Sequence, residues 1–203
     1  MTDMTNQDAQ FTDKYEKSGK AARWLIDRFY HAVIQMLDPP SAGKLLLEVG
    51  CGAGYSTQYL RRCLAQDQTL RATDIGSSLL NAAQARNPGT DFFQSSVYAL
   101  PLADKSVDSV VMLEVLEHLE DPGAALAELS RVARQRVVIS TPREPLWCAL
   151  NMARGKYLGS FGNTPGHIQH WSSKGLKKIA SDHFVIKACR TPIPWTILQL
   201  SPR

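Results

Sequence analysis

The chain is organised around the stretch Lys44-Leu-Leu-Leu-Glu-Val-Gly-Cys-Gly-Ala-Gly-Tyr55. Its first half is a short, nearly continuous apolar run, which is typical of a strand buried on both faces of a parallel sheet. Glycines follow at positions 50, 52 and 54, and the segment 56–64 then has the apolar spacing of a helix. Strand, glycine turn and helix in this order predict the first unit of a nucleotide-binding α/β fold.

The spacing of the glycines argues against a dinucleotide. In the fingerprint G-x-G-x-x-G the third glycine stands three residues after the second, and here that position is Tyr55. A carboxylate, Glu48, stands near the end of the strand instead and suits a cationic ligand, while the wide glycine loop lets the backbone approach a ligand without phosphate. The alternative is a plain glycine-rich turn, which explains the glycines but not the rest of the pattern.

A second acidic residue follows at the expected distance. The segment 69–74 reads as a strand that ends in Asp74, which stands 20 residues after Gly54. In nucleotide-binding folds of this type an acid at this distance binds the ribose hydroxyls through charge-assisted hydrogen bonds. The alternative is an Asp that caps the helix beginning near Ser77, and we favour the ribose role.

Two stretches resemble a known family. The segment 48–54 resembles motif I of the class I S-adenosylmethionine-dependent methyltransferases, and Glu114-Val-Leu-Glu-His118 resembles the V-L-E-H motif of their ubiquinone/menaquinone methyltransferase-like (type 11) group. The resemblance covers about residues 15–200. It implies S-adenosyl-L-methionine as cofactor and a Rossmann-like three-layer α/β sandwich, whose seven-stranded, mostly parallel sheet has the order 3-2-1-4-5-7-6, with the last strand antiparallel and helices on both faces.

The resemblance also implies which residues contact the cofactor. The glycines would approach its methionine and ribose parts, and Cys51 would merely line their loop. Ser96 stands where the family usually has an acid for the adenine amino group, so its hydroxyl must substitute or the contact is lost. A tyrosine before the first helix often reaches the cofactor, although it could equally only pack. The expected set is Tyr15, Glu48, Gly50, Cys51, Gly52, Gly54, Asp74, Ile75, Ser96, Val97, Leu113, Glu114 and His118.

The chain is expected to form one domain, residues 11–203, after a disordered tail at residues 1–10. The segment 21–37 has apolar residues four apart and predicts an amphipathic helix, which with its flanks would form an N-terminal lid, 11–40. Residues 143–171 interrupt the regular alternation of strands and helices, and long insertions of this kind are usually functional. We therefore expect them to form a substrate lid.

Methyl transfer from a sulfonium is an in-line displacement, so the protein mainly aligns donor and acceptor. An oxygen or carbon acceptor also needs a base, and His167 and His170 are the candidates because histidine titrates near neutrality. Either could instead only fasten the lid. Their H-x-x-H spacing shows no third ligand, so no metal is expected.

Five residues of the lid region are candidates for binding the acceptor. Two arginines could hold an anionic group, although solvated arginines are as common. Three aromatic residues could form an apolar pocket, the lid's own core, or a surface that meets a membrane. These residues are Arg143, Arg154, Trp147, Tyr157 and Trp171.

Composition sets further bounds. The chain has 203 residues, a net charge of +4 and a pI near 8.9, and its scattered basic residues argue against a nucleic-acid partner. The four cysteines show no C-x-x-C spacing, which favours free thiols in a reducing compartment. The sequence has no apolar run of membrane-spanning length and its N-terminus is polar, so we expect a cytoplasmic protein. A monomer or homodimer is expected, and peripheral membrane contact is left open.

Together these observations predict a methyltransferase for a small-molecule acceptor, with O-methylation in cofactor or secondary-metabolite biosynthesis as the main hypothesis. A motif for methylating base amines, Asn/Asp-Pro-Pro-aromatic, does not follow the fourth strand. The alternatives are a protein or RNA methyltransferase and a non-catalytic subunit that binds the cofactor.

Overall fold

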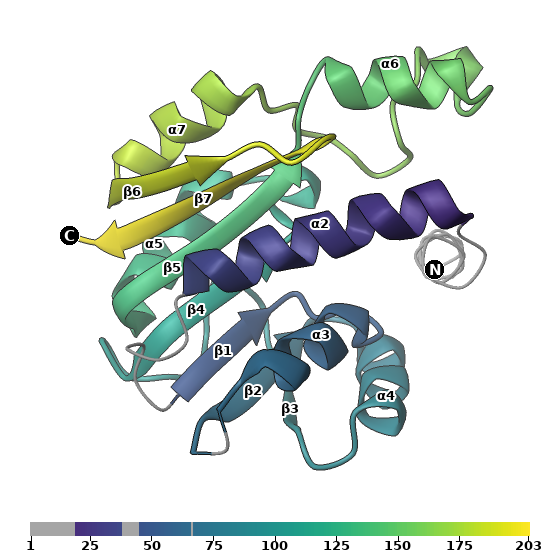
Figure 1. Ribbon diagram of the computed structural model, residues 1–203. Helices are drawn as coiled ribbons and strands as arrows, with labels where there is room; N and C mark the ends of the chain where they lie inside the picture. Colours follow the sequence, from purple (N-terminus) through teal and green to yellow (C-terminus); the bar gives the residue numbers. More distant parts are fainter. Residues whose placement is uncertain (1–18, 38–44, 66) are drawn as a thin grey trace.

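A computed structural model describes residues 19–37, 45–65 and 67–203 (Figure 1). Tyr15, the expected tail and the ends of the expected N-terminal lid therefore lie outside the described residues. The described part contains a seven-stranded sheet. Its strands are β1 (Leu45–Val49), β2 (Thr69–Asp74), β3 (Asp91–Gln94), β4 (Val107–Leu113), β5 (Ala133–Pro142), β6 (Phe184–Arg190) and β7 (Trp195–Pro202).

The strand order is β3-β2-β1-β4-β5-β7-β6, which confirms the predicted topology. Strands β1 to β5 are parallel, whereas β7 runs antiparallel to both of its neighbours. In β1, Glu48 is in register with Ala72 of β2 and with Val111 of β4. The carboxyl ends of these three strands therefore meet at one edge of the sheet, which is where ligands bind in open α/β folds.

Helices cover both faces of the sheet, as predicted. One apolar cluster joins α5 (Pro122–Val132) and α7 (Ser173–Ser181) to the sheet, and the other joins α2 (Lys20–Leu37) and α3 (Tyr55–Cys63) to it. In Figure 1, α2 crosses in front of the sheet and α5 lies behind it. The helix α4 (Ser77–Arg86) packs beside α3, against β2 and β3.

The N-terminal helix is an integral part of the domain. Its buried face includes Phe29, Val33 and Leu37, as the four-residue spacing predicted. The ring of Phe29 packs on Trp195 at a centroid distance of 4.8 Å, and Gln199 Nε2 donates a hydrogen bond of 2.8 Å to the carbonyl of Met36. This helix is thus anchored to β7 over much of its length.

The start of α5 follows from its sequence. Asp121 is the N-cap and accepts a hydrogen bond of 2.9 Å from the backbone N–H of Ala124, and Pro122 occupies the first helical turn. The helix ends at Val132, because β5 already begins at Ala133.

The insertion 143–171 contains α6 (Leu146–Ala153) and a short 3-10 helix, η2 (Leu158–Ser160). Figure 1 shows α6 beyond the end towards which β5 points. A second 3-10 helix, η1 (Leu116–His118), follows β4 at the same edge. Among the described helices, none is long and apolar enough to cross a membrane.

Candidate functional site

The glycine loop connects β1 to α3 and requires its glycines. Gly50, Gly52 and Gly54 have φ values of 77°, 51° and 79°, in the left-handed region that side chains disfavour. A Cβ on Gly50 would lie 2.3 Å from Cγ2 of Val115, and one on Gly54 would lie 2.8 Å from the Cα of Ala83. The loop is therefore both turned and closely packed against its neighbours.

Residues at the end of α4 brace the glycine loop. Asn87 is buried and its Nδ2 donates a hydrogen bond of 2.8 Å to the carbonyl of Gly54. Arg86 donates to the carbonyl of Ala53, and its guanidinium lies 3.7 Å from the ring centroid of Tyr55. These two contacts could not be predicted from the sequence, because an Arg-Asn pair at a helix end has no distinguishing pattern.

Glu48 ties the strand to the following helix. Its side chain is 1% exposed, and its Oε2 accepts a hydrogen bond of 2.5 Å from the hydroxyl of Thr57 on α3. Burial raises the pKa of Glu48 to about 7. Its other oxygen, Oε1, has no hydrogen-bond partner among the described residues, so the carboxyl group keeps an acceptor available beneath the loop.

Asp74 lies directly beside the glycine loop. Its Oδ2 accepts a hydrogen bond of 2.8 Å from the backbone N–H of Gly52, and its Oδ1 accepts one of 2.9 Å from that of Gly76. The N-cap of α4 is Gly76, so Asp74 does not occupy the capping position that was the alternative interpretation. A carboxylate can accept about four hydrogen bonds, so Asp74 can still receive a pair of ribose hydroxyls.

Two further predicted cofactor residues flank this centre. Ile75 is 66% exposed and follows Asp74 at the edge of the sheet. Cys51 is buried within the loop, and burial raises the pKa of its thiol. The thiol therefore stays protonated, which does not favour a role as nucleophile.

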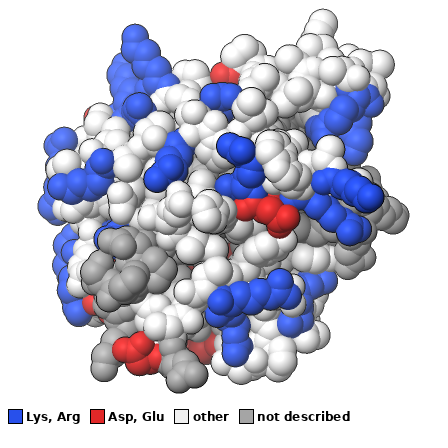
Figure 2. Space-filling model, viewed as in Figure 1, with Lys and Arg blue, Asp and Glu red and all other residues white. Residues whose placement is uncertain are grey.

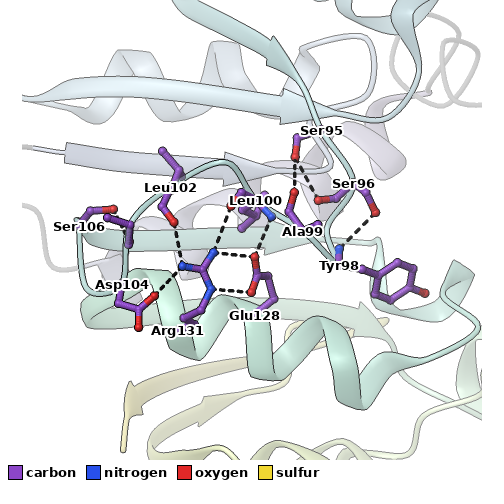
Figure 3. Close-up of polar contacts among 11 residues, drawn as sticks. Ser95, Ser96, Tyr98, Ala99, Leu100, Leu102, Asp104, Ser106, Glu128 and Arg131 are labelled. Carbon is purple, nitrogen blue, oxygen red and sulfur yellow. Dashed lines mark hydrogen bonds and ion pairs between the residues drawn. The ribbon is translucent and has the colours of Figure 1, made fainter.

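The loop after β3 carries the residues expected at the adenine side. Ser96 Oγ accepts a hydrogen bond of 3.2 Å from the backbone N–H of Tyr98, while Ser95 Oγ donates to the carbonyls of Ser96 and Ala99 at 3.1 Å each (Figure 3). Ser96 and its neighbour Val97 are both partly exposed. The hydroxyl of Ser96 thus takes part in a hydrogen bond within the turn that carries Ser96 itself.

Arg131 of α5 anchors the next part of this loop (Figure 3). Its guanidinium forms two hydrogen bonds of 2.7 Å with Glu128 and donates to the carbonyls of Leu100 and Leu102 at 3.0 and 2.8 Å. Glu128 in turn accepts from the backbone N–H of Leu100 at 2.7 Å, and the hydrogen bonds from Arg131 lower the pKa of Glu128. This anchor was not predicted, since it joins residues about thirty positions apart.

Glu114 follows β4 in an unusual backbone conformation. Its φ is 57°, which is uncommon for a residue other than glycine. Its buried carboxylate accepts hydrogen bonds from Ser140 Oγ of β5 at 2.9 Å and from Trp195 Nε1 of β7 at 2.7 Å. Glu114 was predicted to contact the cofactor, and these bonds direct its carboxylate towards β5 and β7. The preceding residue, Leu113, is 7% exposed at the end of β4.

The lid returns to η1 and brings three aromatic rings together. The rings of His118 and His167 lie edge to face at a centroid distance of 4.9 Å. Trp147 of α6 stacks over His167 at 6.1 Å, and its Nε1 donates a hydrogen bond of 2.9 Å to Thr164 Oγ1. His167 is buried, whereas His118 is exposed. The structure therefore joins predicted residues from three segments: η1, α6 and the end of the lid.

The remaining predicted lid residues lie elsewhere. His170 is exposed and its Nδ1 lies 3.7 Å from Glu144 Oε1, apart from the cluster around His167. Arg154 is exposed and donates to Leu150 and Asn151 of its own helix. Trp171 packs against the core under α5 and α7, Arg143 is partly buried at the end of β5, and Tyr157 is half-buried before η2.

Comparisons with known proteins agree with this geometry. Residues 47–140 match a family described as "Methyltransferase domain", type 11. A probable S-adenosylmethionine-dependent methyltransferase of Mycobacterium tuberculosis is 34% identical over 117 residues, which is 57% of this chain and 42% of that protein. Tocopherol O-methyltransferase of Arabidopsis thaliana is 29% identical over 167 residues, 77% of this chain and 42% of that protein.

A similar fold occurs in magnesium protoporphyrin IX methyltransferase of Synechocystis, solved with bound S-adenosylhomocysteine. That structure superposes with a TM-score of 0.71 at 19% identity and covers 97% of this chain and 96% of its own. The sequence alignments with the two curated relatives cited above each span less than half of the relative's length. The fold is that of the class I methyltransferases. Residues 47–140, a little under half of the chain, match the type 11 methyltransferase domain family.

Proposed function

We propose that the protein is an S-adenosyl-L-methionine-dependent methyltransferase acting on an oxygen of a small-molecule acceptor. The observation that carries the proposal is the contact between the glycine loop and Asp74, in which the N–H of Gly52 donates to Oδ2 at 2.8 Å. It joins the two most specific parts of the sequence pattern, the glycine loop and the acid that is expected to bind the ribose, at one point of the sheet edge.

The neighbouring residues fit this cofactor. The available Oε1 of buried Glu48 suits a cationic ligand near the loop. The exposed side chain of Ile75 offers an apolar surface next to Asp74, which suits an adenosine moiety. Ser96 and Val97 are partly exposed on the anchored loop after β3, where they would hold the adenine. When bound, the cofactor supplies a methyl group on a sulfonium, which is already a good leaving group.

The acceptor would lie above Glu114 and beside His167. Glu114 is held towards β5 and β7 by Ser140 and Trp195, and His167 is packed between Trp147 and His118. Of the two predicted bases, His167 is therefore favoured over His170, because it belongs to this enclosed cluster. An oxygen acceptor must lose its proton as the methyl group arrives, and a neutral imidazole can accept it.

The lid favours an apolar acceptor. Among its residues, Phe161 is 82% exposed, Leu158 is 62% exposed and Ile168 is 53% exposed. Exposed apolar side chains gathered in one insertion often mark a ligand or membrane contact. The O-methyltransferase named above, which acts on tocopherol, supports an oxygen acceptor on an apolar molecule.

The charge distribution does not favour the nucleic-acid alternative. Figure 2 shows Lys and Arg on this face as several separate groups, with uncharged surface between them. Proteins that bind nucleic acid usually gather such residues into one face or stripe. On the face shown, the basic residues therefore do not form the stripe that is expected of an RNA-binding surface.

The test is transfer of a labelled methyl group from S-adenosyl-L-methionine into an extract by the purified 203-residue chain. Label in a small, organic-soluble product is the expected result. Label in protein or RNA would favour a macromolecular acceptor, and no transfer, with cofactor binding intact, would favour a non-catalytic subunit. The His167→Gln and His170→Gln variants are compared in parallel, and only the first is expected to lose transfer.

A further inference from the structure

We propose that Glu117, His118 and His167 form a binding site for a divalent transition-metal ion. Each residue offers one ligand atom, and the three atoms all lie within 4.8 Å of one another. Ligand atoms around one zinc ion lie roughly 3–4 Å apart, because each bond is about 2.0–2.2 Å long. Small side-chain rotations would therefore bring these atoms into coordination.

The three ligands lie on two segments that are joined by backbone hydrogen bonds. Glu117 and His118 stand on η1 after β4, and His167 stands near the end of the lid. The backbone N–H groups of Ile168 and Gln169 both donate to the carbonyl of Glu117 at 3.0 Å. Backbone hydrogen bonds on the C-terminal side of His167 thus fix its position relative to Glu117.

The hydrogen bonding of His118 selects the ligand atom. Its Nδ1 lies 2.8 Å from the carbonyl oxygen of Gly166, and a carbonyl can only accept, so Nδ1 carries the proton. In the neutral ring the lone pair is then on Nε2. A histidine that donates one ring nitrogen to a backbone carbonyl while the other binds metal is the usual arrangement around protein-bound metals.

Two of the three ligands are buried and the third is exposed. Glu117 is 1% exposed and His167 is 9% exposed, so both would hold the ion from inside the protein. Stacking with Trp147 restricts the ring of His167. His118 is exposed, so the ion would be reached from solvent on that side.

The donor set indicates which ions fit. Two imidazoles and one carboxylate suit Zn²⁺, Fe²⁺, Mn²⁺ or Co²⁺ better than Ca²⁺ or Mg²⁺, which prefer oxygen ligands. Three protein ligands also leave coordination positions open. From the sequence no metal was expected, because only the pair His167 and His170 was weighed as ligands. The fold instead places His167 with Glu117 and His118, and it places His170 in another cluster.

The open positions give the ion a chemical role, which rests on the proposed function. The site follows β4 at the sheet edge, so an acceptor hydroxyl could bind the ion there. A metal lowers the pKa of a bound hydroxyl, so its proton would be released to water. The oxygen would then form a bond to the methyl carbon as the carbon–sulfur bond of the cofactor breaks, and S-adenosylhomocysteine would leave. With the ion bound, His167 would be a ligand, and loss of the proton from the ion-bound hydroxyl would replace the direct role of His167 as base that is proposed above.

The second cluster is a built-in control. Glu144, Cys148 and His170 also lie within 4.8 Å of one another. Burial, with a smaller contribution from the hydrogen bond to Glu144, raises the pKa of Cys148 to about 11. In this cluster Cys148 Sγ already donates a hydrogen bond of 3.3 Å to Glu144 Oε1, and none of the three residues is buried, unlike Glu117 and His167.

The test titrates the chelator-treated 203-residue chain with Co²⁺ and Zn²⁺, with neither cofactor nor acceptor present. Calorimetry and visible Co²⁺ absorption should show about one ion per chain, with Mg²⁺ binding much more weakly. Glu117→Gln and His167→Gln should weaken binding at least 100-fold, and His170→Gln should leave it unchanged. The exposed His118→Asn keeps the test valid if a buried variant fails to fold.

Two outcomes would overturn the site: no saturable binding by the wild type, or binding that survives in Glu117→Gln and His118→Asn but disappears in His170→Gln. Because the titration contains no cofactor, its failure is distinct from failure of the methyltransferase proposal. Transfer that is insensitive to chelators yet lost in His167→Gln would return His167 to the role of base.

Discussion

The indole Nε1 of Trp195 donates a hydrogen bond of 2.7 Å to Oε2 of Glu114, across 81 positions of the sequence. This bond joins the residue that leaves β4 to the first residue of β7, the inserted antiparallel strand. Ser140 Oγ on β5, between them, donates to the other carboxylate oxygen of Glu114 at 2.9 Å. The three strands are thereby tied together beneath the proposed acceptor position.

Replacing Trp195 with Phe removes the N–H donor but keeps an aromatic ring. We expect the free energy of unfolding to fall by about 2–3 kcal/mol, because a buried carboxylate loses a charge-assisted hydrogen bond. Urea denaturation of Trp195→Phe, Glu114→Gln and the double variant measures the coupling between the two residues. Strictly additive losses would show that the bond contributes nothing of its own.

Alanine at Gly54 tests the packing of the glycine loop. Its Cβ would lie 2.6 Å from Nδ2 of Asn87 and 2.8 Å from the Cα of Ala83, at a φ of 79°. We expect a loss of about 3–4 kcal/mol in unfolding free energy, from backbone strain of about 1–2 kcal/mol plus steric displacement.

Gly89→Ala is the matched control for this variant. Its φ is 84°, but its Cβ would meet only the guanidinium of Arg61, at an ordinary contact distance of 3.6 Å. The control should show the strain alone, about 1–2 kcal/mol. Equal losses in the two variants would mean that close packing around Gly54 has no energetic weight.

The raised pKa of Glu48 predicts how stability depends on pH without ligand. Between about pH 4.5 and 7 the unfolded chain has ionised this carboxyl while the folded chain keeps it protonated, so the unfolded state binds fewer protons. The contribution is fully present below pH 4.5 and is lost as the pH rises through 7. It amounts to about 3 kcal/mol.

Glu48→Gln should flatten this part of the profile. Denaturation at pH 5 and pH 8 measures the difference between the variant and the wild type, which cancels the other titrating groups. A profile that is the same in both proteins would mean that Glu48 titrates near its ordinary pKa in the folded state.

Arg131→Lys should loosen the loop after β3, because an ammonium cannot replace the paired hydrogen bonds to Glu128 while also reaching the carbonyls of Leu100 and Leu102. Hydrogen–deuterium exchange should rise at least 10-fold in residues 95–103. Arg134→Lys is the control, since Arg134 is a more exposed neighbour that donates to Lys105 and Asp108. Equal exchange in the two variants would remove Arg131 as the anchor.

The strands and the glycine loop could be predicted because their signals are local. The apolar run before Gly50, the glycine spacing and the position of Asp74 each lie within a short segment, and each requires a particular backbone shape. The antiparallel last strand came from the family resemblance, and the sheet confirms it.

The partners of the site residues could not be predicted in the same way. The bonds from Ser140 and Trp195 to Glu114, and the place of His167 beside His118 rather than His170, depend on how the lid folds back over β4. No periodicity in the chain encodes such contacts, because side chains far apart in sequence meet only after the sheet has formed.

The most direct test of the central claim is calorimetric titration of the purified chain with S-adenosylhomocysteine, with NAD as the comparison ligand. The account predicts saturable binding of S-adenosylhomocysteine alone. Asp74→Asn should weaken it roughly 10- to 100-fold through the lost charge-assisted bonds, and Asp91→Asn, which alters only an exposed pair with Arg71, should leave it unchanged. Binding of NAD instead, or no binding of S-adenosylhomocysteine by the wild type, would contradict the account.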